Sequence, residues 1–439
     1  MVLCGKIRYH ILSILGGVTM PSISQSIIIN VDSSYIETYI KQKGFTRSEE
    51  EKGKELKYWA DELLQEEKLK RSDFEDFLFE ELFCGKRKSV RIYKLDSIRH
   101  IKFGQDWQIP LKEKYNIDSL NFKNILGTIP NSGDRRKIAA ITSEVNHKNE
   151  LVSIRLLFVL FAQTYKDQVV NDTLAYIPVE INFNNKTMII KAWNRNGLVD
   201  GDRPDEMMDH IKKIMSSSFN VITKRFGIRH KKVLYNMSQG LISDIYQKIP
   251  AYTKIPLLEE KIREFEQTVL SVLPLENIHE TGEGISLNSG VLDFNDEIHK
   301  VIEKLTVSDY FYDMPYEEVW NMGIDTIISR IRFNDVEHVL ASLSGEESDI
   351  PVFCTKTFMS LKKSMEDAEL VEKLWIAKER SRGRLALKYD ASKDEYLGIL
   401  ILSNIRFKQA DLNLALEIYR SYGSEKTKQT TEENRRYVV

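Results

Sequence analysis

The sequence has few of the residues that mark disulfide-rich, linker-rich or membrane-spanning proteins. Its 439 residues include 3 cysteines, 10 prolines and 21 glycines. Cys4, Cys84 and Cys354 lie far apart and form no Cys-x-x-Cys pair, so neither a disulfide framework nor a structural zinc site is expected. The low proline and glycine content argues against a linker-rich chain. A reducing, cytoplasmic location fits this composition best.

An excess of one charge is also missing. The chain has 63 Lys and Arg residues against 65 Asp and Glu residues, so its net charge of −2 indicates no class of partner. No apolar run is long enough to span a membrane, and we expect no membrane association. The apolar stretch 11–15 is too short for a secretory signal, so residues 1–19 are expected to be a frayed or spurious extension.

Motifs of common enzyme chemistry are absent too. The sequence contains no GxxxxGK[ST], HExxH or GxSxG motif, and no GxGxxG motif follows a predicted strand. The 8 histidines are scattered, and none has a His or Cys partner at metal-ligand spacing. We therefore favour a protein that is not an enzyme and that has no cofactor and no metal site, although hydrolysis stays open.

Ample apolar residues are present, and their spacing predicts a multi-unit α+β fold. Hydrophobic residues make up 42% of the chain. Helical spacing and the capping-box pairs Ser34/Glu37 and Ser72/Glu75 predict an acidic helical unit over 20–85. Within this unit, the β-branched run 26–31 is expected to form a strand, and 34–43 a helix. An antiparallel sheet domain is predicted over 86–195, with strands near 90–95, 136–145, 151–163, 174–183 and 186–194.

Two details of the predicted sheet domain concern its topology. Residues 151–161 are apolar on both faces after Arg155, which is typical of a central strand covered on both sides. Asn184 and Asn185 separate two strand candidates, and asparagine tolerates positive φ, so a tight hairpin turn is expected between them.

The remainder of the chain alternates between helical and mixed character. A basic helical region is predicted over 196–275, with Pro204 as the first residue of one helix and a second helix over 234–248. Residues 276–291 are polar and contain three glycines, which indicates a linker. A C-terminal α+β unit is predicted over 292–423, with a helix over 357–380 and a β-hairpin near 384–402. Residues 424–439 are expected to be a mobile tail.

The most informative feature is the stretch from His210 to Ser243, which contains no Asp or Glu but many cations. Helical periodicity places Lys213 and Lys224 on one face, opposite the apolar face of Ile211. Lysine and arginine side chains of this kind contact phosphates. The candidate nucleic-acid-binding residues are therefore Lys212, Lys213, Lys224, Arg225, Arg229, Lys231 and Lys232. A solvated helix face, or pairing with acidic residues of 49–81, is the ordinary alternative.

Two further basic clusters are weaker candidates. The second cluster is predicted to join a helix end to the first strand of the hairpin, an order that winged-helix modules use, and consists of Lys378, Arg380, Arg382 and Arg384. An ordinary corner of an α+β unit is the preferred explanation. The third cluster, Lys86–Lys88 with Arg91, is expected to be an exposed loop.

These observations lead to one favoured function and two alternatives. The favoured function is a non-enzymatic protein that binds the backbone of DNA or RNA, as a subunit of a larger bacterial assembly such as mobile-element or antiviral machinery. The first alternative is a protein–protein adaptor whose basic face meets an acidic partner or a second copy of the chain. The other is a metal-dependent nuclease-like hydrolase in which Asp172 and Glu180 flank one strand of the sheet domain.

Overall fold

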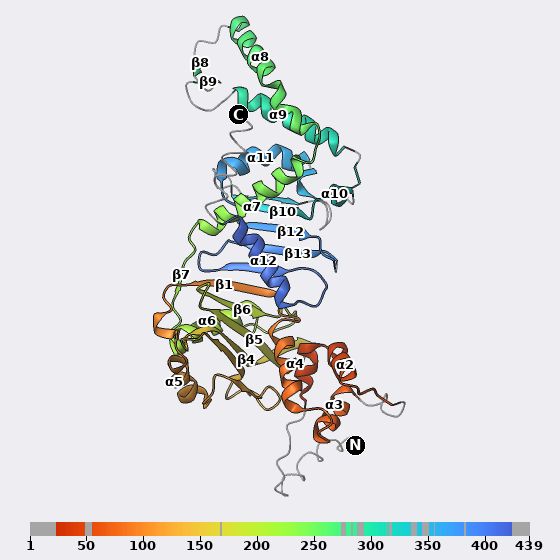
Figure 1. Cartoon of the computed structure of the whole chain (residues 1–439), viewed down its shortest axis with the longest axis vertical. Helices are drawn as coiled ribbons and strands as arrows, with labels where there is room; N and C mark the ends of the chain where they lie inside the picture. Colours follow the sequence, from red (N-terminus) through yellow and green to blue (C-terminus); the bar gives the residue numbers. More distant parts are fainter. Residues whose placement is uncertain are drawn as a thin grey trace. The chain divides into compact units, whose positions relative to one another are not determined.

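A computed structural model of the chain describes residues 23–48, 55–166, 169–273, 278–281, 284–287, 294–312, 314–315, 318–334, 340–344, 351–354, 356–381 and 383–423. These residues form helices and antiparallel strands, so the fold is α+β, as the sequence predicts (Figure 1). The predicted extension (1–19) and the predicted tail (424–439) lie outside the described residues.

Contacts divide the chain into two compact units that alternate along the sequence. Unit 1 comprises 1–87, 98–186 and 190–221, and unit 2 comprises 88–97, 187–189 and 222–439. The segments predicted from the sequence instead follow one another in chain order, with boundaries at 85, 195, 275 and 291. The two divisions differ because a strand at 89–95 pairs with strands of the C-terminal half. Such pairing leaves no mark on local composition.

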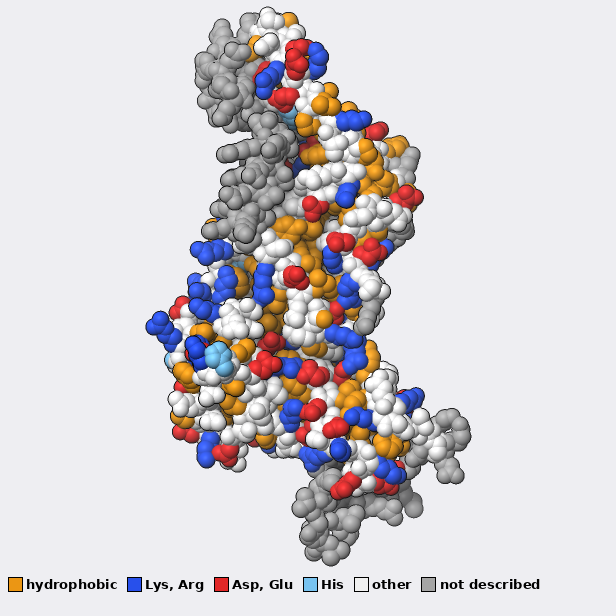
Figure 2. All heavy atoms as spheres, in the orientation of Figure 1, with side chains coloured by type: hydrophobic (Ala, Val, Ile, Leu, Met, Phe, Trp, Pro, Cys, Tyr) orange, Lys and Arg blue, Asp and Glu red, His pale blue; other side chains and the backbone are white. Residues whose placement is uncertain are grey.

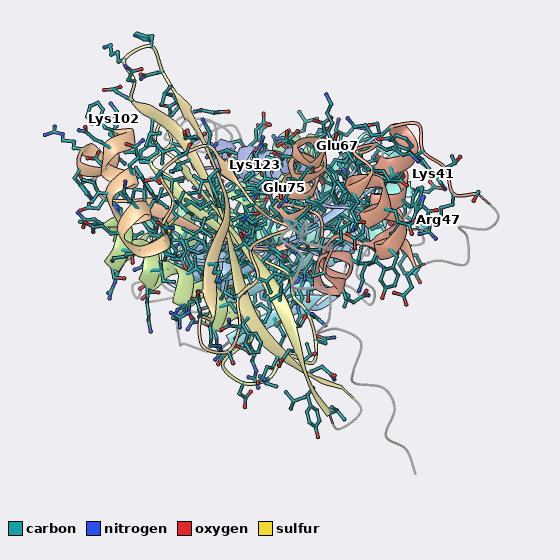
Figure 3. All side chains as sticks on the ribbon, turned by 90° about the horizontal axis from the view of Figure 1, so that it is seen from below. Lys41, Arg47, Glu67, Glu75, Lys102 and Lys123 are labelled. Atoms are coloured by element: carbon teal, nitrogen blue, oxygen red, sulfur yellow. The ribbon has the colours of Figure 1, made fainter. Side chains whose placement is uncertain are left out.

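Unit 1 is an antiparallel sheet with helices on both faces (Figure 3). Its strand order is β6-β5-β4-β3-β2, and of β6 only residues 190–192 belong to this unit. The strands are β2 (Phe122–Lys123), β3 (Arg136–Val145), β4 (Leu151–Lys166), β5 (Val169–Asn182) and β6 (Thr187–Ala192). One face carries α1 (Gln25–Val31), α2 (Ser33–Gln42), α3 (Leu56–Gln65) and α4 (Arg71–Phe83), and the other carries η2 (Arg99–Ile101), α5 (Gly104–Tyr115) and α6 (Pro204–Phe219).

Strand β4 lies in the middle of this sheet and is buried from both sides. Leu157 and Val159 belong to the apolar core that α1–α4 share with the sheet. Phe158, which points the other way, meets the ring of Tyr115 in α5 at a centroid distance of 6.4 Å. The prediction of a central strand covered on both faces is confirmed.

Residues 25–31 form helix α1 and not the strand predicted for 26–31. The side chain of Ser24 caps this helix by accepting a hydrogen bond from the backbone N–H of Ile27. Ile27, Asn30 and Val31 are buried at helical spacing, so burial of one helical face outweighs the strand preference of the isoleucines.

The third basic cluster is not an exposed loop, because Arg87 is fully buried and Arg91 is nearly so. Arg87 donates hydrogen bonds to the backbone oxygen and to the Oδ1 of Asn30, both at 2.7 Å. The Nδ2 of Asn30 in turn donates to the backbone oxygen of Leu174 at 2.9 Å. Burial lowers the pKa of Arg87 to about 9. This network connects the segment after α4 to α1 and β5.

Unit 2 contains a second antiparallel arrangement, with strand order β11-β10-β12-β13-β14-β1, and β7 also pairs with β1. The strands are β1 (Ser89–Leu95), β7 (Thr223–Lys224), β10 (Thr326–Asn334), β11 (Leu340–Ser344), β12 (Lys373–Lys378), β13 (Leu385–Asp390) and β14 (Leu397–Ile401). The helices are α7 (Arg229–Tyr246), η3 (Tyr252–Leu258), α8 (Glu259–Val272), α9 (Phe294–Tyr310), α10 (Glu318–Asn321), η4 (Val352–Cys354), α11 (Lys356–Ala368) and α12 (Gln409–Ser421).

The hairpin β13–β14 is confirmed, whereas the helix predicted over 357–380 ends at Ala368. Residues 373–378 form β12 because they pair with both β10 and β13, which bury Leu374 and Ile376. The stretch 276–291 contains a separate hairpin, β8 (Ile278–Thr281) with β9 (Gly284–Leu287), and its other residues lie outside those described. Within the described chain, no helix has the length and apolarity needed to cross a membrane.

The buried Arg87 network predicts a specific loss of stability. Asn30→Ala leaves one guanidinium nitrogen of Arg87 buried without its acceptor and should lower the free energy of unfolding by about 2–3 kcal/mol. Equilibrium urea denaturation followed by tryptophan fluorescence measures this change. The matched change Asn171→Ala, at an exposed site in the same unit, should stay within about 0.5 kcal/mol. Equal effects of the two variants would contradict the role of the network.

Candidate nucleic-acid interface

Helix α6 carries the first two predicted binding residues but not the third. It begins at Pro204, as predicted, and holds Lys212 and Lys213 in unit 1. The helix stops at Asn220, whose φ of 54° is left-handed and whose N–H donates to the Met215 oxygen. Lys224 therefore does not share a helical face with Lys213, and the predicted common face is wrong.

Lys224 instead lies in the short strand β7 of unit 2, which pairs with β1. Lys94 of β1 is directly opposite Lys224, and Leu95 is opposite Thr223. Asp96 continues the ladder by donating its backbone N–H to the Ile222 oxygen at 3.0 Å. Lys94, which the sequence analysis did not single out, thus faces another cation across the ladder. Like charges in such positions destabilise a sheet.

Helix α7 begins at Arg229, five residues before the predicted start at 234, so the cations of 229–232 occupy its first turn. The first turn contains no acidic residue, and the N-cap residue Ile228 makes no side-chain capping bond. Helix N-termini carry partial positive charge and favour anions. Cations in the first turn of α7 therefore work against the stability of the helix.

We call five side chains of unit 2 the basic patch. Four of them are exposed and form no ion pair or side-chain hydrogen bond with any residue in the described ranges, namely Lys224, Arg225, Arg229 and Lys232. The fifth, Lys94, is partly buried with its Nζ 4.4 Å from the centre of the Phe226 ring. Burial, with Arg229 and Lys224 nearby, lowers the pKa of Lys94. Figure 2 shows Lys and Arg side chains gathered beside β7 and the start of α7. The patch consists of Lys94, Lys224, Arg225, Arg229 and Lys232.

Lys231 differs from its neighbours because an acid faces it. Its Nζ lies 3.6 Å from the Oε1 of Glu372, and its backbone oxygen accepts the N–H of Val371. Its charge is partly neutralised, so Lys231 is not counted in the basic patch.

His230 anchors the first turn of α7. The side chain is fully buried, and its Nε2 lies 2.6 Å from the backbone oxygen of Ala391, after β13. The N–H of Phe226 donates to the Asp394 oxygen at 2.7 Å. Burial lowers the pKa of His230, and Lys231 and Lys94 act in the same direction. The start of α7 is thus fixed to the turn between β13 and β14.

The second basic cluster is largely neutralised. Lys378 forms an ion pair with Asp325 at 2.5 Å, and Arg380 forms one with Asp411. The guanidinium of Arg384 lies 4.5 Å from the ring of Trp320. Arg382 lies outside the described residues. Lys378 ends a strand and not a helix, so the order of elements expected for a winged-helix module is not found.

The acidic residues of α4 are paired within unit 1. Glu75 binds Arg71, Asp76 binds Lys123, and Glu80 binds Arg155 at 2.8 Å. Glu75 and Lys123 both lie on the side of the sheet that α1–α4 cover (Figure 3). These carboxylates already have cationic partners in their own unit.

The two carboxylates of the nuclease hypothesis do not converge. Asp172 and Glu180 are eight residues apart on β5, which corresponds to about 26 Å along an extended strand. Asp172 accepts a hydrogen bond from Gln163, and Glu180 pairs in register with Arg155. Among the residues that the structure describes, no group of three or more His, Cys, Asp and Glu side chains is placed to hold a metal ion.

Neither a protein-family model nor a curated protein matches the chain. The interpretation of the basic patch therefore depends on its geometry and charge.

The environment of His230 predicts a dependence of stability on pH. Because the pKa of His230 is lower in the folded protein than in the unfolded chain, the unfolded chain binds more protons as the pH falls through 6.5, so the free energy of unfolding should fall as the pH falls. The contribution is at most about 1.4 kcal/mol per pH unit. His230→Gln should reduce this slope, measured by urea denaturation at pH 7.5 and 5.5. The exposed control His147→Gln should not, and an unchanged slope in His230→Gln would contradict the assignment.

Proposed function

We propose that this protein binds the sugar–phosphate backbone of nucleic acid through the basic patch, without catalysing a reaction. The observation that supports this most strongly is the pairing of Lys94 with Lys224 beside exposed, unpartnered arginines and lysines. Folding alone gains nothing from placing these cations together, since each repels the others. A bound polyanion converts the repulsion into attraction and releases counterions.

The start of α7 adds hydrogen-bond donors to these charges. The backbone N–H groups of Arg229, His230 and Lys231 have no acceptor among the described residues, whereas the N–H of Lys232 is bonded to Ile228. These free donors belong to the first turn of the helix, where a phosphate oxygen is a favourable acceptor. Charge and directional hydrogen bonds are therefore available at the same end of α7.

The geometry favours contacts to phosphates over contacts to bases. Helix α7 packs against β10, β12 and α12, and its buried side includes Leu234, Met237, Leu241 and Ile245. A recognition helix needs a free face along several turns to enter the major groove. In α7, the basic residues are confined to the first turn. Backbone contacts of this kind position a protein on nucleic acid without reading its sequence.

An acidic protein partner is the second candidate, and one observation favours it. Ile222 and Ile228, which lie on either side of residues 224–225, are 47% and 58% exposed. Exposed apolar side chains next to cations suit a protein interface with a charged rim. In this case the protein would act as an adaptor.

Salt dependence tests the nucleic-acid proposal. Fluorescence anisotropy with labelled single- and double-stranded DNA and RNA should show binding that weakens as salt rises. If all five patch residues contact phosphates, log K should fall with log salt with a slope of about −3.5 to −4.5. Lys224→Glu with Arg225→Glu should weaken binding and make the slope shallower by about 1.4–1.8 or more.

A matched control separates the patch from overall charge. Lys248→Glu with Lys254→Glu changes the net charge equally in unit 2, at exposed residues beyond the other end of α7. Lys248 lies at least about 21 Å from Lys232 along the axis of helix α7. This exceeds the ~10 Å over which salt at 0.1 M screens the interaction between charges. The control should bind nearly as the unchanged protein does. An equal loss in both variants, or no binding at low salt, would overturn the proposal; the second outcome favours the adaptor.

A further inference from the structure

Unit 1 contains a cleft of about 370 Å³ between α6 and the neighbouring ends of β3 and β4. Four α6 residues, Glu206, Asp209, His210 and Lys213, recur at helical spacing and line one side. Arg136 starts β3 directly opposite Leu160 of β4 and lines the other side. The cleft is within the size range of small-molecule sites. Its remaining lining residues are Arg135, Phe161, Gly201, Asp202 and Met207.

Asp202 and Glu206 accept hydrogen bonds that fix the segments around the cleft. Asp202 accepts hydrogen bonds from Arg135 Nη2 at 3.0 Å and from the backbone N–H of Gln163 at 2.9 Å. Glu206 accepts the backbone N–H groups of Gly201 and Arg203, both at 3.0 Å, and so fixes the start of α6. These carboxylates hold the walls of the cleft in place.

Three basic groups at the cleft have no partner among the described residues. Arg136 and Lys213 are exposed and make no side-chain ion pair or hydrogen bond with the described residues. The ring of His210 likewise makes no ion pair or hydrogen bond with the described residues, although its Nε2 is buried. Burial lowers the pKa of His210, and the nearby charges of Arg136, Lys213 and Arg135 lower it further.

We propose that this cleft binds a small organic phosphate monoester, with Arg136, Lys213 and His210 holding the phosphate group. Arginine offers a planar pair of donors, lysine a mobile charge and histidine a ring N–H, so three oxygens can be contacted from three directions. A carboxylate has only two oxygens and matches this set less well. Leu160, Phe161 and Met207 provide an apolar wall for the organic part.

This proposal is independent of the nucleic-acid proposal. Every residue of the cleft belongs to unit 1, whereas the basic patch belongs to unit 2. Lys213 alone was among the binding residues predicted from the sequence. The failure of one proposal therefore leaves the other standing.

Titration with inorganic phosphate tests the site in the full-length protein. Isothermal calorimetry should show saturable binding. NMR with ¹³C-labelled histidine should show the His210 ring signal shifting along the same curve, with the signal assigned by its loss in His210→Gln. No saturable binding, or binding that leaves the His210 signal in place, would overturn the proposal.

A matched pair of variants locates the contact. Lys213→Gln and Arg136→Gln should each weaken phosphate binding roughly tenfold or more, because each removes a charge-assisted hydrogen bond. Lys212→Gln removes the same charge from the adjacent residue of α6, which does not line the cleft, and should bind normally. Lys224→Glu with Arg225→Glu should also bind normally. Equal weakening in Lys212→Gln and Lys213→Gln would reject the site.

The organic part of the ligand is tested separately with phenyl phosphate. This ester should bind more tightly than inorganic phosphate because its ring contacts the apolar wall of the cleft. Phenol should not bind measurably, since it lacks the phosphate. Equal affinity for phenyl phosphate and inorganic phosphate would overturn the monoester assignment.

Discussion

The pairing of β1 with both β14 and β7 is the constraint on which the basic patch depends. The ladder with β7 sets Lys94 against Lys224, and that with β14 sets Ser89 against Leu400. From β7 the chain turns through Phe226, which Lys94 covers, directly into α7. His230 then holds α7 to the turn that precedes β14. Lys94 and Lys224 therefore cannot separate without disturbing this ladder, and the start of α7 cannot move without disturbing the turn.

Positive charge is balanced differently around the buried Arg87 of unit 1 and in the basic patch of unit 2. In unit 1, Arg87 is buried against two oxygens of Asn30, and Arg155 binds Glu80 while its guanidinium lies 4.0 Å from the Phe83 ring. In the described part of unit 2, the cations of the patch have neither acids nor capping groups to balance them. Natural proteins keep such destabilising arrangements mainly at surfaces that have a function. The contrast explains why the count of cations in a sequence is a poor guide to a binding surface.

Local patterns in the sequence predicted local structure well. The helix expected at 34–43 is α2, although Asp32 and not Ser34 provides its cap, and the strands of unit 1 lie near the predicted ranges. The predictions were wrong where pairing with strands distant in the sequence determines the local structure. Residues 373–378 form β12 because they pair with β10 and β13, and Lys224 lies in a strand because it pairs with β1. The helical periodicity of the sequence continues through 220–224, so the sequence does not show that α6 ends at Asn220. Only the left-handed backbone conformation of Asn220 in the structure shows it. Arg136 and His210 share no motif, and folding alone brings them to one cleft.

The interleaving of the units has a consequence for synthesis on the ribosome. Ser89 pairs with Leu400, so roughly 300 residues must be translated before β1 can meet β14. At ordinary elongation rates this takes about 15–60 s, during which the edge of β1 that pairs with β14 lacks this partner strand. Neither unit is a contiguous fragment of the chain. The nascent protein therefore has a long interval in which the β14 side of β1 is open to pairing with other chains.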